Sequence, residues 1–313
     1  MILPLRNCAS VTRFTQYLLI TTLSLTFTAQ LAFSADWSRT EIINYANLSP
    51  KYVKDHNKDG WVGLFDDDDS FVEDPVGGYH FVKNQSQNQI SFFWDAFIAK
   101  NDITFIIARD IVSDLTVIRD AVVHAVIPSI NQIVDTPAHL RYTLEDQSGS
   151  LRVKSLQAYW SMPTAISDTL GRGVTGLKIM GAQLGEIFRG LGVDEGLDHF
   201  LKAWIVGVHH CGQREVAQMT AALSHGQSHD FLKTFSKRGV VVFNSTHTSI
   251  SPQEFFDGHY VIANPYKIIS AGESVAMNCD LIRNNGKPQP IFAVANFKRL
   301  KIVSLELFTD SRR

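Results

Sequence analysis

The sequence has little excess charge and few cysteines. Its 29 Lys and Arg residues nearly balance 31 Asp and Glu residues, which leaves a net charge of −2. A nucleic-acid-binding protein needs clustered basic residues for phosphate contacts, so this balance argues against nucleic acid as a partner. Three cysteines are too few for a disulfide scaffold. The 45% apolar content and 313 residues instead indicate a globular protein of about two domains.

Long apolar runs are also scarce, and the clearest one lies at the N-terminus. Arg6 and Arg13 precede a mostly apolar stretch at residues 17–33, and a small-residue pattern, Ala-Phe-Ser, ends at Ser34. This arrangement predicts a signal peptide over residues 1–34 and an exported, periplasmic or secreted protein. A retained membrane anchor is the alternative, because the run approaches the length that crosses a bilayer. Cleavage would leave no stable membrane span.

Export would place the two remaining cysteines in an oxidising compartment. A disulfide between Cys211 and Cys279 and a pair of buried free thiols are both compatible with the sequence, which does not give their separation.

An internal repeat divides the chain. The segments LRVKSLQAY (residues 151–159) and LKIVSLELF (residues 300–308) share the order Leu, basic, β-branched, any, Ser, Leu, any, apolar, aromatic. Both alternate with the two-residue period of a strand, and both end a β-rich stretch. A duplicated unit explains the echo better than chance.

Each half places helix-like segments before a run of strands, which is an α+β pattern. The predicted domains are residues 35–162 and 208–313, joined by a helical linker at 163–207. The linker carries an apolar stripe, for which packing between the domains and membrane-surface binding are the two explanations: Leu177, Met180, Leu184, Ile187 and Leu191.

The segment FVEDPVG (residues 71–77), together with LFDD (64–67), ISFFW (90–94) and LQAYWS (156–161), resembles the ketosteroid isomerase/SnoaL-like group. That group lies within the nuclear-transport-factor-two-like superfamily of cone-shaped α+β proteins. The resemblance covers residues 37–161 and implies a curved antiparallel sheet wrapped on N-terminal helices, with an apolar pocket at the open end. Through the repeat, the chain is predicted to hold two such cones in tandem.

Asp74 is the strongest candidate for chemistry. Pro75 favours an extended backbone at Asp74, at the end of a strand, and alternation sends Glu73 to the opposite, solvated face. A carboxyl group facing an apolar pocket would have a raised pKa suited to taking a proton from carbon. The resemblance implies the same role of proton-shuttling base. The alternative is a residue that only caps a turn.

Such chemistry also needs donors for an oxyanion, and ketosteroid isomerases use a tyrosine and a protonated aspartic acid. Tyr52, or less favourably Tyr45, is the candidate helix tyrosine. The strand at residues 137–142 has no carboxylate, so His139 is the candidate second donor, with a core histidine as the alternative.

Five aromatic residues are predicted to line the pocket, with ordinary core packing as the alternative for each: Phe65, Phe93, Trp94, Tyr159 and Trp160. In the second half, Asn244 stands where Asp74 stands in the first. Because an amide cannot act as a base, the second cone is predicted to be structural, regulatory or ligand-holding.

Two metal sites are weaker alternatives, and no cofactor is expected. Asp55, Asn57, Asp59 and Asp66 have the spacing of a calcium loop without its final Glu. The same stretch also suits an ordinary helix–helix turn. The second alternative is a zinc site on residues with the right ligand types: His209, His210, Cys211, His225 and His229.

The sequence thus predicts a hydrophobic pocket in the first cone for a steroid-like or polyketide-like molecule. In its enzyme form, Asp74 moves a proton next to a carbonyl group, as an isomerase does. In its binding form, the pocket holds the ligand without turnover. A third interpretation makes the cones a dimerisation module, and a homodimer is compatible with each.

Overall fold

The computed structural model describes residues 36–65, 68–83, 88–179, 181, 185, 207–244, 246–284 and 286–310. The predicted signal peptide and most of the predicted linker therefore lie outside the described residues. Among the helices that are described, each is too short or too polar to traverse a lipid bilayer.

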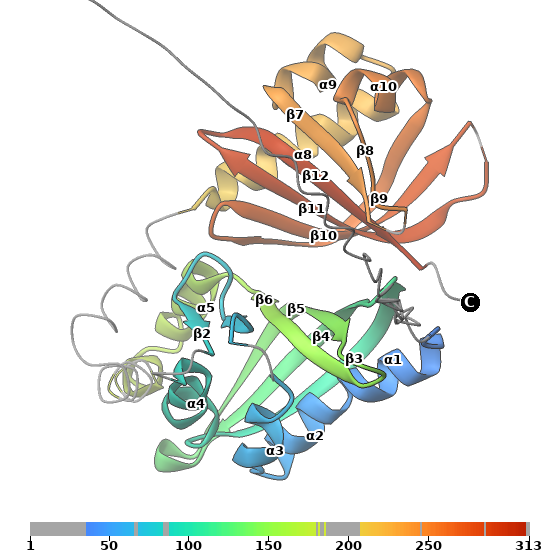
Figure 1. Cartoon of the computed structure of the whole chain (residues 1–313). Helices are drawn as coiled ribbons and strands as arrows, with labels where there is room; N and C mark the ends of the chain where they lie inside the picture. Colours follow the sequence, from blue (N-terminus) through green and yellow to red (C-terminus); the bar gives the residue numbers. More distant parts are fainter. Residues whose placement is uncertain are drawn as a thin grey trace, which may run out of the picture. The chain divides into compact units, whose positions relative to one another are not determined.

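The first cone begins with three short helices and continues into a six-stranded sheet (Figure 1). Its elements are α1 (Arg39–Ala46), α2 (Leu48–Lys54), α3 (Lys58–Val62), β1 (Phe71–Glu73), β2 (His80–Val82), α4 (Gln89–Phe93), a π-helical turn (Trp94–Ile98), β3 (Asp102–Ser113), β4 (Thr116–Ile127), a 3-10 turn (Pro128–Ile130), β5 (Gln132–Asp146), β6 (Leu151–Tyr159) and α5 (Met162–Leu170). The strand order is β2-β1-β6-β5-β4-β3.

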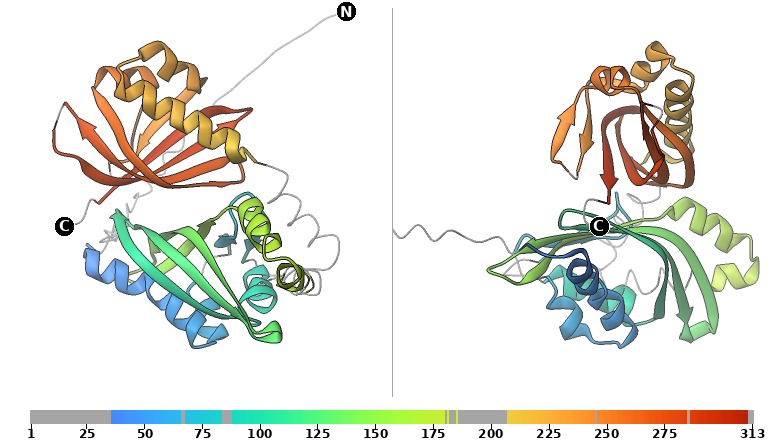
Figure 2. Two further views of the ribbon diagram at one scale, coloured as in Figure 1. Left: turned by 180° about the vertical axis from the view of Figure 1, so that it is seen from behind. Right: turned by 90° about the vertical axis from the view of Figure 1, so that its right-hand side faces the viewer.

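Local sequence explains where the first helices start. Ser38 caps α1 and forms a reciprocal capping box with Glu41, which satisfies backbone N–H groups that the helix leaves open. Asn57 caps α3 by accepting a hydrogen bond from the Gly60 N–H at 2.9 Å. Because of these caps, residues 39–62 form short separate helices rather than one long helix. The helices lie against one face of the sheet in all views (Figures 1 and 2).

The second cone repeats this plan. Its elements are α8 (His209–Ser224), α9 (Ser228–Thr234), β7 (Phe235–Phe243), β8 (Thr248–Ile250), α10 (Pro252–Asp257), β9 (Tyr260–Ala271), β10 (Ser274–Arg283), β11 (Gln289–Lys298) and β12 (Lys301–Thr309). The order β8-β7-β12-β11-β10-β9 matches that of the first sheet, and the two repeat segments form the equivalent strands β6 and β12.

The predicted α+β class with two tandem cones is therefore confirmed. The sheets are mixed rather than purely antiparallel, because β1 runs parallel to β6 and β7 runs parallel to β12. The two strands of each parallel pair lie far apart in the sequence, with several strands and at least one helix between them, so the connection is long enough for parallel pairing.

Each cone has its own apolar core, and a third cluster joins the two sheets. The third cluster combines residues of both cones: Val76, Ile111, Ile118, Tyr159, Ala271, Ala276, Phe292, Val294 and Phe308. A polar chain accompanies it, in which Asp120 pairs with Lys267 and accepts from the Asn278 Nδ2 at 2.8 Å. Asn278 Oδ1 in turn accepts from Arg109 at 2.8 Å. Part of the outer face of each sheet is thus buried against the other cone.

Both remaining cysteines are free thiols. Cys211 is exposed on α8, whereas Cys279 is buried in β10, and burial raises the pKa of the Cys279 thiol to about 12. The predicted disulfide is therefore not formed. The alternative, a pair of buried free thiols, holds for Cys279 but not for the exposed Cys211.

Candidate functional site

A cavity of about 290 Å³ lies on the inner face of the first sheet. Strands β3 to β6 supply one wall, and the other walls come from α2, α3, the α4 region and α5. Most lining side chains are aliphatic or aromatic, as in typical small-molecule sites. The polar lining residues are Ser49, Asp74, Asn101, Thr136, Tyr142, Thr169 and the indoles of Trp61 and Trp160.

Asp74 is the one carboxyl-bearing residue among the described residues that line this cavity. It directly follows β1, which β6 holds in parallel register through the pairs Val72–Leu156 and Glu73–Gln157. Its Oδ1 accepts a hydrogen bond from the Trp160 indole N–H at 2.5 Å. Burial raises the pKa of Asp74 to about 6, and the Trp160 hydrogen bond opposes that rise. A carboxyl group poised near neutrality can exchange a proton with a bound molecule.

The neighbouring Glu73 points away from Asp74 and secures the turn. Its Oε1 accepts from the Gly77 N–H at 2.9 Å, and its Oε2 accepts from Gln157 at 3.0 Å. Glu73 is therefore half-buried and bonded, where the sequence predicted a solvated side chain, because the turn that contains the cis Asp74–Pro75 peptide folds back over it.

A cluster of hydroxyl groups also faces the cavity. The Ser49 hydroxyl accepts from the Trp61 indole at 3.0 Å and from the Tyr142 hydroxyl at 3.4 Å. The Trp61 indole can only donate, whereas either hydroxyl group of the Ser49–Tyr142 pair can supply the shared hydrogen, so one of the two keeps a hydrogen for a bound molecule. Burial raises the pKa of Tyr142, so its phenol stays protonated at neutral pH and remains a donor. Tyr142 and Ser49 were not among the predicted site residues.

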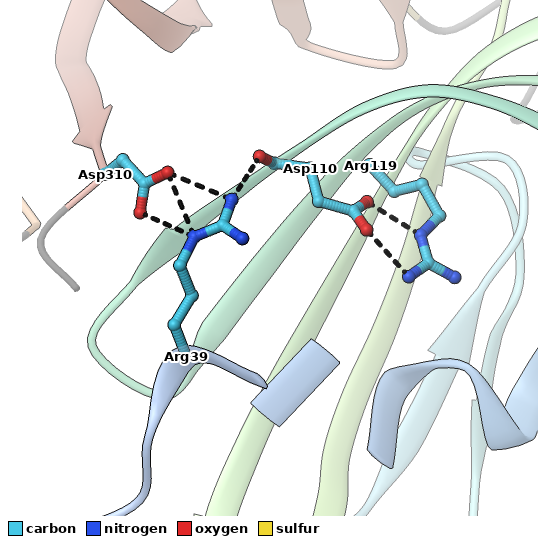
Figure 3. Close-up of polar contacts among 4 residues, drawn as sticks. All are labelled: Arg39, Asp110, Arg119 and Asp310. Atoms are coloured by element: carbon cyan, nitrogen blue, oxygen red, sulfur yellow. Dashed lines mark hydrogen bonds and ion pairs between the residues drawn. The ribbon is translucent and has the colours of Figure 1, made fainter. Parts of the chain in front are cut away.

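A buried arginine, Arg119, lies close to the Tyr142 ring, and Figure 3 shows its contact with Asp110. Arg119 has no exposed surface, and it donates two hydrogen bonds to the Asp110 carboxylate at 2.8 and 3.0 Å. It also donates to Asn47 at 2.8 Å, and its guanidinium lies 5.8 Å from the centre of the Tyr142 ring. Its positive charge favours the phenolate and thus opposes the effect of burial on Tyr142.

The predicted donors lie elsewhere. Tyr52 and Tyr45 pack at the edge of the core, while Ser49 and Val53 form the cavity-facing side of α2. His139 lies on the outer face of β5, where its Nε2 meets the Lys267 carbonyl at 2.9 Å and its ring packs on Phe292. Because neighbours in a strand alternate, Leu140 and Tyr142 face the cavity and His139 faces the second cone. Burial lowers the pKa of His139 to about 4, so it is neutral there.

The predicted aromatic lining is divided between three places. Phe93 and Trp160 line the cavity. Phe65 and Trp94 pack around Trp61 in the core, with ring centres 5.0 and 5.6 Å from it. Tyr159 faces the second cone against Phe292, and burial raises its pKa to about 12. The alternation of side chains along a strand is enough to predict that Tyr159 and Trp160 point to opposite faces. The core packing of Phe65 and Trp94 depends on where α3 and α4 meet, which the sequence does not give.

Helix α5 supplies a wall that the sequence did not predict. Met162, Ala165, Ile166 and Thr169 line the cavity, at the spacing i, i+3, i+4, i+7 of one helix face, and Ile179 lies further along the chain. The predicted first domain ended at residue 162, so this helix was assigned to the linker. The helical spacing was present in the sequence and would have indicated the face.

The second cone has an aromatic ring where the first has its carboxyl group. Strand β7 pairs with β12 through Val241–Leu305 and Val242–Glu306, which places Phe243 at the position of Asp74. The predicted equivalence of Asn244 is therefore wrong by one residue, since three successive valines allow several registers. Phe243 lies 6.1 Å from Phe255 and 5.4 Å from Tyr260, so rings fill this end of the second core.

The residues of the predicted calcium loop are engaged in ordinary helix contacts. Asp55 pairs with Lys51 at 2.8 Å, Asn57 caps α3, Asp59 lies in the first turn of α3, and Asp66 lies outside the described residues. In the part of the chain that the structure describes, no group of three His, Cys, Asp or Glu residues could hold a metal ion. His225 of the alternative zinc set instead contacts its own helix, with Nδ1 2.7 Å from the Ala221 carbonyl.

No family model and no curated protein sequence matches the chain. Solved structures do. RV0760c of Mycobacterium tuberculosis, in complex with estradiol-17beta-hemisuccinate, is 18% identical over 39% of this chain and 94% of that chain, with a TM-score of 0.34. The Delta 5-3-ketosteroid isomerase of a Mycobacterium species is 19% identical over 39% and 93%, with a TM-score of 0.34. An NTF2-like protein of unknown function from Cytophaga hutchinsonii is 14% identical over 32% and 91%, with a TM-score of 0.29.

These alignments each span about the length of one cone. The matched proteins include a ketosteroid isomerase and an NTF2-like protein, the group to which residues 37–161 are predicted to be similar. The sheet order and the helices before it establish the α+β fold independently of them.

Proposed function

We propose that the first cone binds an apolar small molecule whose polar end meets Asp74, Tyr142 and Ser49. The observation that carries the proposal is a carboxyl group, the one found among the described lining residues, in a largely apolar cavity wall, with its pKa raised to about 6. A ligand of steroid-like or polyketide-like character has the required apolar body and the oxygen that these donors would hold.

The same geometry supports proton transfer at a carbon next to a carbonyl group. The Asp74 carboxylate would take a proton from that carbon, and the electron pair of the C–H bond would pass to the carbonyl oxygen as an enolate. In the hydrogen-bonded pair of Tyr142 and Ser49 hydroxyl groups, one hydrogen is used within the pair, and the other would be donated to the enolate oxygen and stabilise it. Asp74 would then return the proton to another carbon of the same system, so the reaction is an isomerisation with no net gain of atoms.

Binding without turnover is the second candidate. It is favoured by the Trp160 hydrogen bond, which occupies one Asp74 oxygen and lowers the basicity of the carboxylate. In that case the other Asp74 oxygen orients the ligand and no C–H bond breaks.

The substitution Asp74→Asn separates the two candidates. Binding of estradiol would be followed by calorimetry, and isomerisation of a β,γ-unsaturated ketosteroid by the ultraviolet absorbance of the conjugated product. Under proton transfer, the variant loses turnover by at least about a hundredfold and keeps its affinity. Asp168→Asn, on the exposed side of α5, is the matched control and leaves both unchanged.

The measurements can also reject the proposal. Estradiol affinity without turnover in the wild type leaves the binding function alone. No affinity for estradiol or for the unsaturated ketosteroid removes the steroid-like ligand class.

Export is a separate part of the proposal, supported by the pattern of residues 1–34. Expression of the full chain in a Gram-negative host, followed by fractionation and N-terminal sequencing, tests it. A mature protein that begins at Ala35 supports export with cleavage, whereas a membrane-bound protein that begins at Met1 contradicts it.

A further inference from the structure

The turn that carries Asp74, residues 74–77, is held in place by hydrogen bonds within the first cone. The Val76 N–H donates to the Ala158 carbonyl at 2.9 Å, and the Gly77 N–H donates to Glu73 at 2.9 Å. These bonds fix residues 74–77 along the end of β6. On its outer side, Val76 belongs to the buried apolar cluster that combines residues of both cones.

A hairpin of the second cone lies against that outer side. Ala271 and Ser274 close the β9–β10 pair, so Gly272 and Glu273 form a two-residue turn with Gly at its first position. The Glu273 carbonyl accepts from the Phe297 N–H at 2.7 Å, and the Gly272 carbonyl accepts from the Val208 N–H at 3.0 Å. The hairpin is therefore anchored to β11 and to the start of α8.

The two turns touch backbone to backbone. A Cβ atom built on Gly272 would lie 2.6 Å from the Gly77 Cα and 3.1 Å from the Val76 carbonyl oxygen. Both glycines have positive φ, +84° at Gly77 and +53° at Gly272, which side chains rarely tolerate. Beside this contact, Val76 and Ala271 belong to the same buried apolar cluster. The close approach thus requires glycine on both sides.

We propose that the β9–β10 hairpin of the second cone positions Asp74 in the cavity of the first. The second cone, whose own core is filled by rings at the equivalent place, then serves the site by holding its carboxyl-bearing turn. Gly272 and Gly77 act as positioning residues through Asp74. The chemical purpose of this support rests on the proposed function of the cavity, but the support itself can be measured without a ligand.

The hydrogen bond between Trp160 and Asp74 supplies the measurement. Only two residues lie between Asp74 and Gly77, so a displaced turn would move the carboxylate away from the indole and admit water beside it. Since burial is the largest cause of the raised pKa of Asp74, such a displacement would lower that pKa towards its ordinary value. The Trp160 indole N–H resonance, assigned with Trp160→Phe, would report the titration of Asp74 by NMR.

The test compares Gly272→Ala with Gly226→Ala in the full chain. Gly226 also has positive φ, +65°, but a Cβ there meets nothing within 4 Å, so it reproduces the backbone strain without the collision. We expect the wild type and Gly226→Ala to share a midpoint near pH 6. In Gly272→Ala the midpoint falls by about one pH unit, and estradiol affinity drops at least about tenfold.

Equal midpoints in a folded Gly272→Ala and in Gly226→Ala would overturn the proposal. If Gly272→Ala fails to fold, Val76→Ala loosens the same contact without a collision, and Val153→Ala is its control in the core of the first cone. A shifted midpoint with no estradiol binding in the wild type would support the positioning role and reject the steroid-like ligand instead.

Discussion

At the scale of single residues, the environment of Asp74 sets two opposing influences against each other. Burial raises its pKa and the Trp160 indole lowers it, and burial prevails because the pKa is about 6. The folded protein therefore binds a proton at Asp74 more tightly than the unfolded chain does. Its contribution to stability is fully present below about pH 4 and is lost as pH rises through about 6.

The substitution Asp74→Asn should accordingly stabilise the protein at neutral pH. The free energy of unfolding, measured by urea denaturation, should exceed that of the wild type by up to about 3 kcal/mol at pH 7.5 and match it at pH 4. Because other groups titrate equally in both proteins, the difference isolates Asp74. A variant that is less stable than the wild type at pH 7.5 would show that the ionised carboxylate is well solvated.

The sequence could indicate Asp74, but it could not identify the groups around it. Pro75 and strand alternation placed Asp74 and Glu73 on opposite sides. Tyr142 and Ser49 come from β5 and α2, which approach one another only in the folded cone. His139 was predicted to be either a donor to the cavity or a core histidine, and its buried place on the outer face of β5 fits the second, because the sequence does not mark which side of β5 is the inner one.

At the scale of elements, buried Arg119 joins three segments of the first cone. It pairs with Asp110 of β3 from its place on β4, and it holds Asn47 at the junction of α1 and α2. On the other side of Asp110, Arg39 donates to its carbonyl oxygen at 3.1 Å and pairs with Asp310 of the second cone (Figure 3). A buried charge with such partners is costly to leave alone.

Arg119→Met should therefore destabilise the protein by about 3–5 kcal/mol, because Asp110 would keep a charge without its partner. The double variant Arg119→Met with Asp110→Asn should recover part of that loss. Chemical denaturation of the wild type, both single variants and the double variant measures the coupling. Additive effects of the two substitutions would mean that the pair contributes no coupling energy.

Helix α5 provides another element-scale prediction, because one of its faces lines the cavity. Ala165→Trp should fill that space and abolish estradiol binding, while thermal stability stays within about 1 kcal/mol of the wild type. Ser167→Trp, on the exposed face of the same helix, should leave affinity unchanged. Retained affinity in Ala165→Trp would place the ligand outside this cavity.

The elements themselves were largely predictable. The echo between residues 151–159 and 300–308 predicted β6 and β12, and the helix-then-strand order predicted the class. Two details depended on contacts. The register of β7 was ambiguous along Val240, Val241 and Val242, and α5 was read as a linker because only the folded sheet shows what its apolar face covers.

At the scale of the whole molecule, the two cones share a core, so neither should unfold alone. Phe292 of the second cone packs against His139 and Tyr159 of the first. In the variant Trp204→Phe, all the remaining tryptophans belong to the first cone, so tryptophan fluorescence reports the unfolding of that cone. Circular dichroism reports the unfolding of both cones. The two signals should give coincident urea transitions.

Phe292→Ala provides the corresponding perturbation. It should shift both transitions to lower urea together, by about 3–5 kcal/mol. A circular dichroism transition that moves while tryptophan fluorescence stays in place would contradict a shared core.

The ring at Phe243 has one more consequence. Duplication has given this polypeptide two copies of a fold, but within the described residues only the first copy places a carboxyl group at this position in a cavity. Saturation of the chain should thus occur at an equimolar ratio, and its isotherm should be hyperbolic rather than sigmoidal. In this proposal the second copy supplies no carboxyl group of its own and supports the turn that carries Asp74.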